Sequence, residues 1–419
     1  RNSTAQIDSN GVTIDTDDIG GLVASKGGAE AGVWVIAETR DLPTGFRKIV
    51  VTDESGYYLI PDLPLASYDI WVRGYGLIDS PKIEAVPGEI VNLTAVEAPT
   101  AQEAAQYYPS SYWYSLLEIP PKSDFPGTGP NGNGIATGLI SQLHWIGQMK
   151  AGAVGGGCSV CHQLGNKATR EIPQELGDFD STVDAWDRRV QSGQAGASMT
   201  AAMSRFGRRR ALEMYADWTD RIVAGEVPSV PPRPQGIERN LVVTQWDWAD
   251  PVGFVHDTVS TDKRNPMLNP NGLVYGVQEF STPDLNILDP VNNSLTRITA
   301  PVRDEDTPFM NPQFVFQPSA HNGDEIVWSG KASLHNPMMD HMGRVWLTHT
   351  IRAPETPDFC REGSNHPSAK LFPVERSNRH LSVYDPSTEG FSLIDTLLTS
   401  STTLFTSSLL AAATTFAIS

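Results

Sequence analysis

Two cysteines and a histidine in this chain are spaced in a way that suits covalent attachment of a haem. Cys158 and Cys161 are separated by two residues, and His162 directly follows the second cysteine. Two thiols at this spacing can add to the two vinyl groups on a haem edge, and the histidine then lies under the iron as its proximal ligand. The pattern therefore predicts one covalent c-type haem, bound through thioethers to Cys158 and Cys161 and ligated by His162.

A Cys-x-x-Cys pair also occurs in zinc sites, in redox-active dithiols and by chance. A zinc site needs a second pair of ligands, and Cys360 is the only cysteine left over from the total of three. A thioredoxin-like dithiol sits in a βαβ context, and the surrounding sequence does not have that pattern. Haem attachment is therefore the favoured interpretation.

Residues 136–228, which contain the cysteine pair, have helical periodicity. Ser181 is a good N-cap for one helix, and a further helix is expected from about residue 199 to residue 222, ending near Gly225. Four apolar residues at four- and three-residue steps can share one face of a helix that leads into the cysteine pair: Leu139, Leu143, Ile146 and Met149. Three helices around one attachment motif resemble a small monohaem cytochrome c domain.

The resemblance to small cytochromes c also bears on the sixth ligand of the iron. A methionine ligand would raise the reduction potential relative to a second histidine. Small cytochromes c often present this methionine from a loop, and Met199 follows the glycine-containing loop 193–196. Met199 is therefore the expected distal ligand, and Met203 is its rival. A histidine such as His144 and an open coordination position remain alternatives.

Residues 1–98 have the short alternating runs of an antiparallel β-sandwich. The expected strands are 32–37, 49–52, 57–60, 68–72 and 90–93. The segments 21–23, 31–35, 52–53 with 56–58, and 68–72 resemble those of a carboxypeptidase regulatory-like domain. That family consists mostly of structural or binding modules, so the resemblance implies no catalytic residue here.

Two proline-rich segments mark the boundaries of the helical region. Residues 99–135 begin with an Ala/Gln-rich stretch, pass through several tyrosines and a tryptophan, and end in a Pro/Gly-rich run. This segment is expected to be a linker that packs on a neighbouring domain. A second boundary is expected at residues 228–234.

Residues 235–395 return to strands and turns with two recurring patterns. One is a Gly-x-Val-Trp or Gly-x-Val-Tyr strand, and the other is a strand that ends in Asp-Pro. The expected strands are 273–277, 285–290, 325–328, 343–348 and 380–386. They resemble blades of a virginiamycin B lyase-like β-propeller. The region accounts for three to four blades, which is fewer than a closed ring generally uses.

Histidines and methionines gather within this propeller-like region. His335, His341 and His349 bracket a stretch containing Met338, Met339 and Met342. Imidazole and thioether groups together can bind copper or another soft metal. Loop histidines satisfied by backbone groups are the favoured interpretation, so a second metal is not the primary expectation.

The last part of the chain departs from the blade pattern. Residues 396–419 contain no charge, proline or glycine. They fit a transmembrane helix poorly because serine and threonine are frequent. A strand that pairs with another chain is a second interpretation. A departure from the natural sequence is the favoured interpretation. A partner cysteine lost in the same way would explain why Cys360 has none in this sequence.

Charge and composition narrow the classes of partner. The chain has 419 residues and a net charge of −18, which argues against binding to nucleic acids or anionic membranes. The 36 glycines and 31 prolines favour loop-rich β structure. The sequence therefore predicts a multidomain, mainly β chain: an N-terminal antiparallel β-sandwich, a central all-α cytochrome c domain and a C-terminal partial β-propeller.

Electron transfer by an exported monohaem protein is the expected function. Haem c is normally installed outside the cytoplasm, so a periplasmic or secreted protein whose leader has been removed is expected. A redox partner protein with basic patches is the expected partner, and other copies of the chain are possible partners. The alternatives are an oxidoreductase whose propeller holds the active site and a structural or assembly protein that carries haem.

Overall fold

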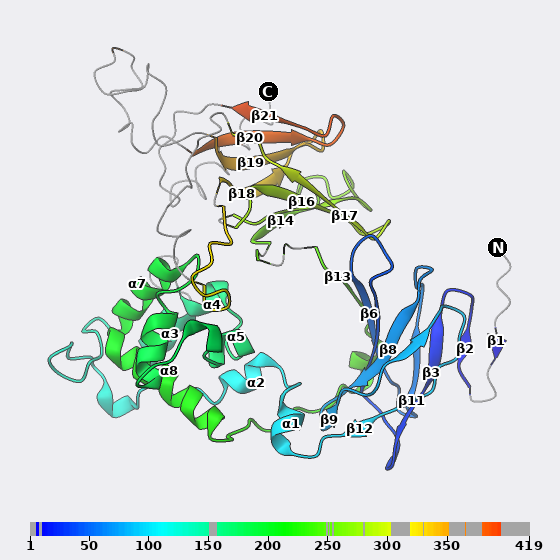
Figure 1. Cartoon of the computed structure of the whole chain (residues 1–419), viewed down its shortest axis with the longest axis horizontal. Coiled ribbons are helices and arrows are strands. Elements are labelled where there is room, and N and C mark those ends of the chain that lie inside the picture. The colour runs from blue at the N-terminus through cyan, green and yellow to red at the C-terminus, as the bar shows by residue number, and fades with distance from the viewer. Residues whose placement is uncertain are drawn as a thin grey trace. The chain divides into compact units, whose positions relative to one another are not determined.

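Figure 1 shows the computed structural model of the chain, which describes residues 6–7, 11–150, 157–248, 250, 252–253, 255–279, 281–302, 319–329, 331–351, 365 and 379–394. The chain divides into two compact units. The first comprises Arg1–Asp247 and Ser319–Gly323, and the second comprises Trp248–Pro318 and Asp324–Ser419. The fold is mainly β with several antiparallel sheets, which confirms the expected class.

Two sheets form the β-sandwich of the first unit. One has the strand order β10 (Ile83–Ala85), β8 (Tyr68–Arg73), β5 (Trp34–Thr39), β6 (Phe46–Val51) and β13 (Val243–Trp246). The other has the order β11 (Leu93–Thr94), β3 (Ile19–Ser25) and β4 (Gly28–Ala29), with β7 (Tyr57–Ile60) also paired to β3. Two small pairs complete it: β1 (Gln6–Ile7) with β2 (Thr13–Ile14), and β9 (Leu77–Ile78) with β12 (Val96–Glu97).

Alternation along the strands builds the core between these two sheets. In β8, Tyr68, Ile70 and Val72 are buried while Asp69 points to solvent. Successive side chains on a strand point to opposite faces, so one face of β8 supplies only apolar groups. Equivalent residues of β3, β5, β6 and β7 join the same cluster. The expected strands 32–37, 49–52, 57–60 and 68–72 therefore overlap the observed β5, β6, β7 and β8.

The sandwich differs from the expectation in two respects. Strand β11 pairs with β3 in the parallel direction, so the expectation of a purely antiparallel sandwich was wrong. Strand β13 comes from the region expected to begin the propeller, yet it pairs with β6 from Val243 opposite Ile49 to Trp246 opposite Phe46. A local strand pattern does not specify which distant strand it will pair with or in which direction. The pairing partners of β11 and β13 could therefore not be predicted from their own sequences.

In chain order, the α-helices of the described residues come between the sandwich strands and β13. They are α1 (Ala101–Ala105), α2 (Ser110–Tyr114), α3 (Gln142–Lys150), α4 (Cys158–Cys161), α5 (Lys167–Arg170), α6 (Thr182–Arg189), α7 (Gly196–Phe206) and α8 (Arg208–Val223). Figure 1 shows α3, α4, α5, α7 and α8 grouped together. Short 3-10 turns occur at Lys122–Asp124, Gln174–Leu176 and Gly236–Asn240. Ser181 caps α6 through a hydrogen bond from the Asp184 backbone N–H, which confirms that predicted start.

The single helix expected over residues 199–222 is two helices. Gly207 is the single residue between α7 and α8, and its φ of 94° ends one helix before the next begins. A β-carbon there would lie 1.9 Å from the carbonyl oxygen of Gly134. Close backbone approach and a left-handed φ both require glycine, and they break the helix where apolar periodicity alone predicted continuity.

The buried face of α3 also differs from the expectation. Leu139 lies before the helix, and Leu143 is 74% exposed. The buried residues of the helix are instead Trp145, Gln148 and Met149. Because the helix begins only at Gln142, the inward face is set by Trp145 and Met149, four residues apart, rather than by the series starting at Leu139.

Residues 99–135 contact the sandwich rather than forming a free connection. The Tyr108 ring packs edge-on against Tyr75, with centroids 5.6 Å apart. The Arg73 guanidinium lies over the Tyr107 ring at 5.0 Å. Trp113 is buried in the same small cluster and donates its ring N–H to the Ala105 carbonyl. This segment therefore fixes the start of the helical region to one edge of the sandwich.

The second unit contains two four-stranded antiparallel sheets, each built in chain order. The first is β14 (Asp257–Val259), β15 (Val274–Val277), β16 (Asp284–Asp289) and β17 (Ser294–Thr299). The second is β18 (Ala332–Met339), β19 (Val345–Thr350), β20 (Arg379–Asp385) and β21 (Gly390–Ile394). One apolar cluster includes buried residues of both sheets.

The two recurring sequence patterns occupy equivalent places in these sheets. Gly-x-Val-Tyr and Gly-x-Val-Trp introduce the second strands, β15 and β19. Asp289 and Asp385 end the third strands, and each carboxylate accepts backbone N–H groups of the following turn. The repeated sequence patterns therefore correspond to a repeated structural unit, the four-stranded sheet. Residues 325–328, by contrast, form no strand, so that prediction was wrong; Trp328 instead donates its ring N–H to the Val252 carbonyl.

Some predictions concern residues that the structure does not describe. Cys360 and residues 396–419 lie outside the described residues, as do 303–318 and most of 352–378 within the segment 235–395 that was expected to form propeller blades. Within the described part of the chain, no helix is both long enough and apolar enough to cross a bilayer.

Candidate functional site

The cysteine pair and the histidine lie in and directly after the single helical turn α4. Cys158 and Cys161 are three residues apart, so their side chains project from neighbouring positions on the turn. The His162 backbone N–H donates to the Cys158 carbonyl at 2.9 Å and closes the turn. Buried Gly157 is the N-cap. Local backbone geometry therefore gathers all three predicted ligating side chains within one turn.

Cys158 lies against the main apolar cluster of the helical region. The thiol is half-buried and packs beside a cluster that includes Trp186, Tyr215 and Trp218. The Tyr215 hydroxyl donates to the Cys158 sulfur at 3.4 Å. Burial raises the pKa of Cys158, and the hydrogen bond from Tyr215 and the charge of Arg205 only partly offset it. Cys161, by contrast, is exposed.

Aromatic packing fixes the Tyr215 side chain that contacts the thiol. The Tyr215 and Trp186 rings stack with centroids 5.0 Å apart and an interplanar angle of 29°. The Trp186 ring N–H donates to Thr219 at 2.9 Å, and Thr219 donates to the Arg170 carbonyl at 2.9 Å. Helices α6 and α8 thus hold the wall against which Cys158 lies.

His162 has an exposed side chain with a basic neighbour. Its pKa is lowered, first because surrounding protein desolvates the ring and second because the Arg189 charge opposes protonation. A neutral imidazole is the form that binds a metal ion. Arg189 is itself desolvated, which lowers its pKa to about 10. One of its amino groups donates to the Ala168 carbonyl, while the other, Nη1, is buried with no hydrogen-bond partner among the described residues.

The candidate distal ligands differ in how deeply they are buried. Met203 is a core residue, 5% exposed. Met199, in the first turn of α7, is half-buried at the margin of the same cluster that Cys158 contacts. His144 is exposed on α3. The helical region therefore places both methionine candidates on α7, and Met199 is the one whose thioether is not fully enclosed by the core.

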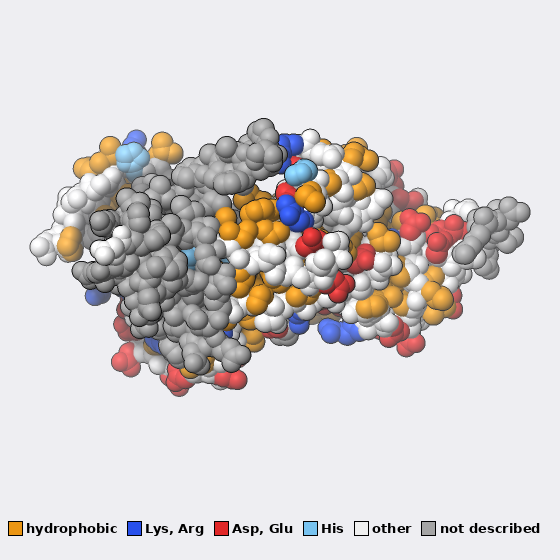
Figure 2. Space-filling model, turned by 90° about the horizontal axis from the view of Figure 1, so that it is seen from above, with side chains coloured by type: hydrophobic (Ala, Val, Ile, Leu, Met, Phe, Trp, Pro, Cys, Tyr) orange, Lys and Arg blue, Asp and Glu red, His pale blue; other side chains and the backbone are white. Residues whose placement is uncertain are grey.

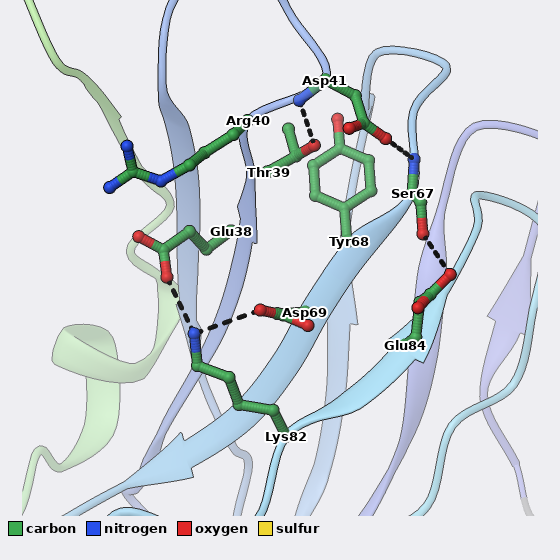
Figure 3. Close-up of a pocket in the computed structure, with 9 residues that line it drawn as sticks. All are labelled: Glu38, Thr39, Arg40, Asp41, Ser67, Tyr68, Asp69, Lys82 and Glu84. Carbon is green, nitrogen blue, oxygen red and sulfur yellow. Dashed lines mark hydrogen bonds and ion pairs between the residues drawn. The ribbon is translucent and has the colours of Figure 1, made fainter.

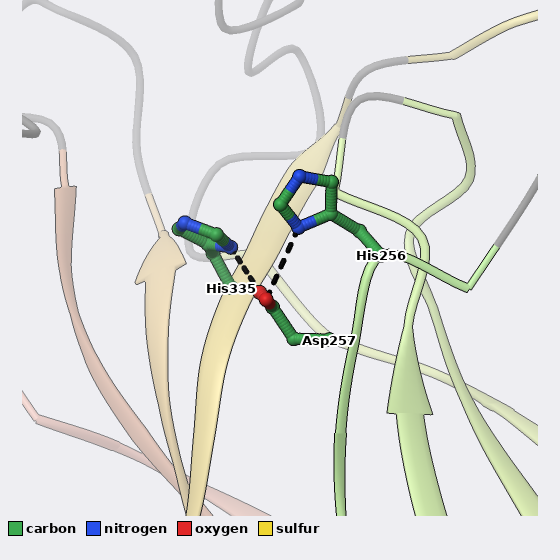
Figure 4. Close-up of side chains that lie close together, drawn as sticks. All are labelled: His256, Asp257 and His335. Atoms are coloured by element: carbon green, nitrogen blue, oxygen red, sulfur yellow. Dashed lines mark ion pairs between the residues drawn. The ribbon is translucent and has the colours of Figure 1, made fainter. Parts of the chain in front are cut away.

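A group of ligand side chains in the second unit was missed by the sequence reasoning. The ligand atoms of His256, Asp257 and His335 all lie within 4.8 Å of one another (Figure 4). The His256 Nδ1 lies 3.2 Å from one Asp257 oxygen, and the His335 Nδ1 contacts the other. His335 had been singled out, but its partners are far away in the sequence, and no spacing pattern links them.

The expected cluster of His335, His341 and His349 does not converge. His341 is exposed in the turn after β18, whereas His349 is fully buried within β19. Among the described residues, His335 is the one of these three that belongs to a group of close ligand atoms. Neither Cys158 nor Cys161 belongs to such a group within the described part of the chain.

The sandwich carries a polar hollow of about 440 Å³ (Figure 3). It is lined by Glu38, Thr39, Arg40, Asp41, Ser67, Tyr68, Asp69, Lys82 and Glu84. Lys82 bridges Glu38 and Asp69 at 3.1 and 3.2 Å, and Ser67 donates to Glu84 at 3.0 Å. Lys82 therefore compensates two of the four carboxylates that line the hollow, Glu38 and Asp69. None of the lining residues belongs to a group of close ligand atoms within the described part of the chain.

The chain matches no protein-family model, and its sequence matches no curated protein.

Proposed function

We propose that this chain is an exported electron-transfer protein that carries one covalent c-type haem. The carrying observation is the arrangement of Cys158, Cys161 and His162 within one turn, with Cys158 against an aromatic cluster. Two adjacent thiols, a following imidazole that favours its neutral form and an apolar wall are the groups that covalent haem binding requires.

Each residue has a distinct role in this proposal. Cys158 and Cys161 each form a thioether by adding the S–H bond across a vinyl group, and His162 supplies the proximal nitrogen. Met199 supplies the distal sulfur. Bound haem provides one-electron oxidation and reduction at its iron, while Tyr215 and Trp186 keep water from the buried thioether.

Arg189 supports the proposal independently of the cysteines. Its buried Nη1 has no hydrogen-bond partner among the described residues, although buried guanidinium groups are normally paired. A haem propionate is an anionic acceptor of suitable size, and Arg189 lies close enough to His162 for their charges to interact. We therefore assign Arg189 as a propionate partner.

The β domains give the haem region its setting in this proposal. The two four-stranded sheets with repeated Asp-Pro strand ends are assigned as blades of a partial β-propeller, and the sandwich as a carboxypeptidase regulatory-like module. Both serve as docking surfaces. The net charge of −18 suits a redox partner with basic patches.

A visible spectrum combined with a redox titration tests the proposal. Protein produced with a haem c maturation system is expected to show a c-type spectrum, one haem per chain and a reversible one-electron transition. A c-type spectrum without reversible reduction would overturn electron transfer while leaving attachment intact. Properly matured protein with no haem band would overturn the proposal as a whole.

A further inference from the structure

The His256, Asp257 and His335 side chains meet where two sheets approach each other in the second unit. Asp257 begins β14, the first strand of one sheet, and His335 lies in β18, the first strand of the other. Figure 4 shows the Asp257 carboxylate between the two imidazole rings. The rings have centroids 5.0 Å apart. Glu279 extends the group, since its carboxylate lies 3.3 Å from the His256 Nε2.

The backbone around these residues departs from regular strand geometry. The register of β18 against β19 shifts on both sides of His335. Such bulges redirect side chains and are frequent beside functional sites. Glu279 and Asn336 adopt left-handed φ values of 38° and 52°, which are uncommon for residues other than glycine. Irregular backbone in β18 and in the turn after β15 thus accompanies the convergence of the side chains.

A supporting hydrogen bond orients the central carboxylate. The Asn336 backbone N–H donates to the Asp257 Oδ2 at 3.1 Å, so the left-handed turn after His335 also holds Asp257. Backbone and side-chain partners of this kind characteristically fix the ligands of metal ions. Glu279 is 8% exposed and His335 is 13% exposed, whereas His256 is 33% exposed, so the group is enclosed on one side and accessible on the other.

The dimensions and donor types suit a divalent transition-metal ion. Zinc is bound tetrahedrally at about 2.0–2.2 Å by histidine nitrogen and carboxylate oxygen, so its ligand atoms lie about 3.4 Å from one another. Ligand atoms within 4.8 Å of one another can close around such an ion with small movements. Magnesium and calcium prefer all-oxygen sites, and the two imidazoles favour zinc-type ions.

We propose that His256, Asp257 and His335 form a binding site for a zinc-type divalent ion between the two sheets. Glu279, which lies at the other ring nitrogen of His256, orients that imidazole. The site uses none of the haem-binding residues and does not depend on the proposed electron transfer. It adds a second metal centre to the chain.

Zinc binding to the whole, haem-loaded chain tests this proposal. The protein is freed of metal with a chelator, equilibrated with buffered zinc, and its zinc content per chain is measured by mass spectrometry. The wild-type protein is expected to bind one zinc ion. His335→Ala is expected to weaken binding by about 100-fold or more, because even the loss of a supporting group costs 10- to 100-fold.

Two further variants keep the test decisive. His341→Ala removes a histidine from the turn after the same strand, outside the group, and is expected to bind zinc like the wild type. Asp257→Asn keeps the side-chain shape and is expected to lose binding. Wild-type protein that binds no zinc, or variants His335→Ala and His341→Ala that bind equally, would overturn the site and leave a hydrogen-bonded His–Asp–His group.

Discussion

At the scale of single residues, the environment of Cys158 is asymmetric. Its thiol lies against aromatic side chains and accepts a hydrogen bond from Tyr215, whereas Cys161, three residues on, is exposed. One thiol is therefore held by the protein core and the other is reachable from solvent. In the proposed function, this difference places one haem edge against the helical core and leaves the other edge near the surface, where electrons can be exchanged.

Replacing the two methionines of α7 separates ligation from packing. Met199→Ala is expected to abolish the sulfur-to-iron charge-transfer band with a modest loss of stability, because Met199 is only half-buried. Met203→Ala is expected to keep the band but lower the free energy of unfolding by about 2–5 kcal/mol, the cost of truncating a buried methionine. A band lost only in Met203→Ala would move the distal ligand to that residue. Visible spectra and denaturant unfolding check both expectations.

Arg189 is expected to influence the haem through its charge. Arg189→Gln should lower the reduction potential by about 40 mV, or roughly 1 kcal/mol for one electron, because a nearby positive charge favours the reduced iron. Arg188→Gln, one position earlier on α6, removes the same charge from a side chain without the buried, unpartnered nitrogen. Equal potentials in both variants would contradict the propionate contact. Potentiometric titration measures the difference.

The residues of the cysteine turn could be predicted from sequence, and those of the histidine group could not. Cys158, Cys161 and His162 are neighbours in the chain, so their proximity follows from spacing alone. His256 and His335 meet only because β14 and β18 begin consecutive sheets and because β18 bulges on both sides of His335. Sequence periodicity carries no signal for either event.

At the scale of secondary-structure elements, Gly207 determines how helices α7 and α8 are joined. Gly207→Ala is expected to lower the free energy of unfolding by about 3 kcal/mol, because a β-carbon strains the left-handed φ and meets the Gly134 carbonyl. Gly147→Ala is the matched control: a β-carbon there meets nothing within 4 Å in a regular helix. It should stabilise the protein by about 0.5–1 kcal/mol. Similar unfolding curves for both variants would show that the break between α7 and α8 does not need glycine.

Element boundaries were predicted well where a local rule sets them. The start of α6 at Ser181 follows from a side-chain cap, and the end of α8 near Gly225 follows from a glycine in the left-handed region. The edge strand β13 was misassigned because its partner β6 lies about 200 residues earlier in the chain. The end of β13 is held by an ion pair between Arg47 of β6 and Asp247, whose nitrogen and oxygen lie 2.9 Å apart.

At the scale of the whole molecule, the boundary between the compact units follows β13. The first unit includes both the sandwich and the helices, and the second holds the two four-stranded sheets. Arg233 ties the proline-rich segment after α8 to the sandwich, with ion-pair contact to Glu30 at 2.5 Å. The segment 228–234, expected as a simple boundary, is therefore held against the first unit.

The net charge predicts how electron exchange depends on salt. Acidic side chains are spread over the sandwich in Figure 2, and the whole chain carries a net charge of −18. Electron transfer with a small basic redox protein should therefore slow by about 10-fold or more as ionic strength rises from low to physiological values. Stopped-flow kinetics with an acidic partner provides the control, for which the rate should rise with salt. Equal salt dependence for both partners would contradict electrostatic steering.

The mass of the unfolded chain tests the central proposal most directly. Protein from a haem c maturation system is denatured, and its intact mass is measured beside the variants Cys158→Ala/Cys161→Ala and Cys360→Ala. The wild-type and Cys360→Ala chains are expected to retain the mass of one haem after unfolding, and the double variant is expected to lose it. A wild-type chain at the bare polypeptide mass, or a haem adduct that survives in the double variant, would contradict covalent attachment through Cys158 and Cys161.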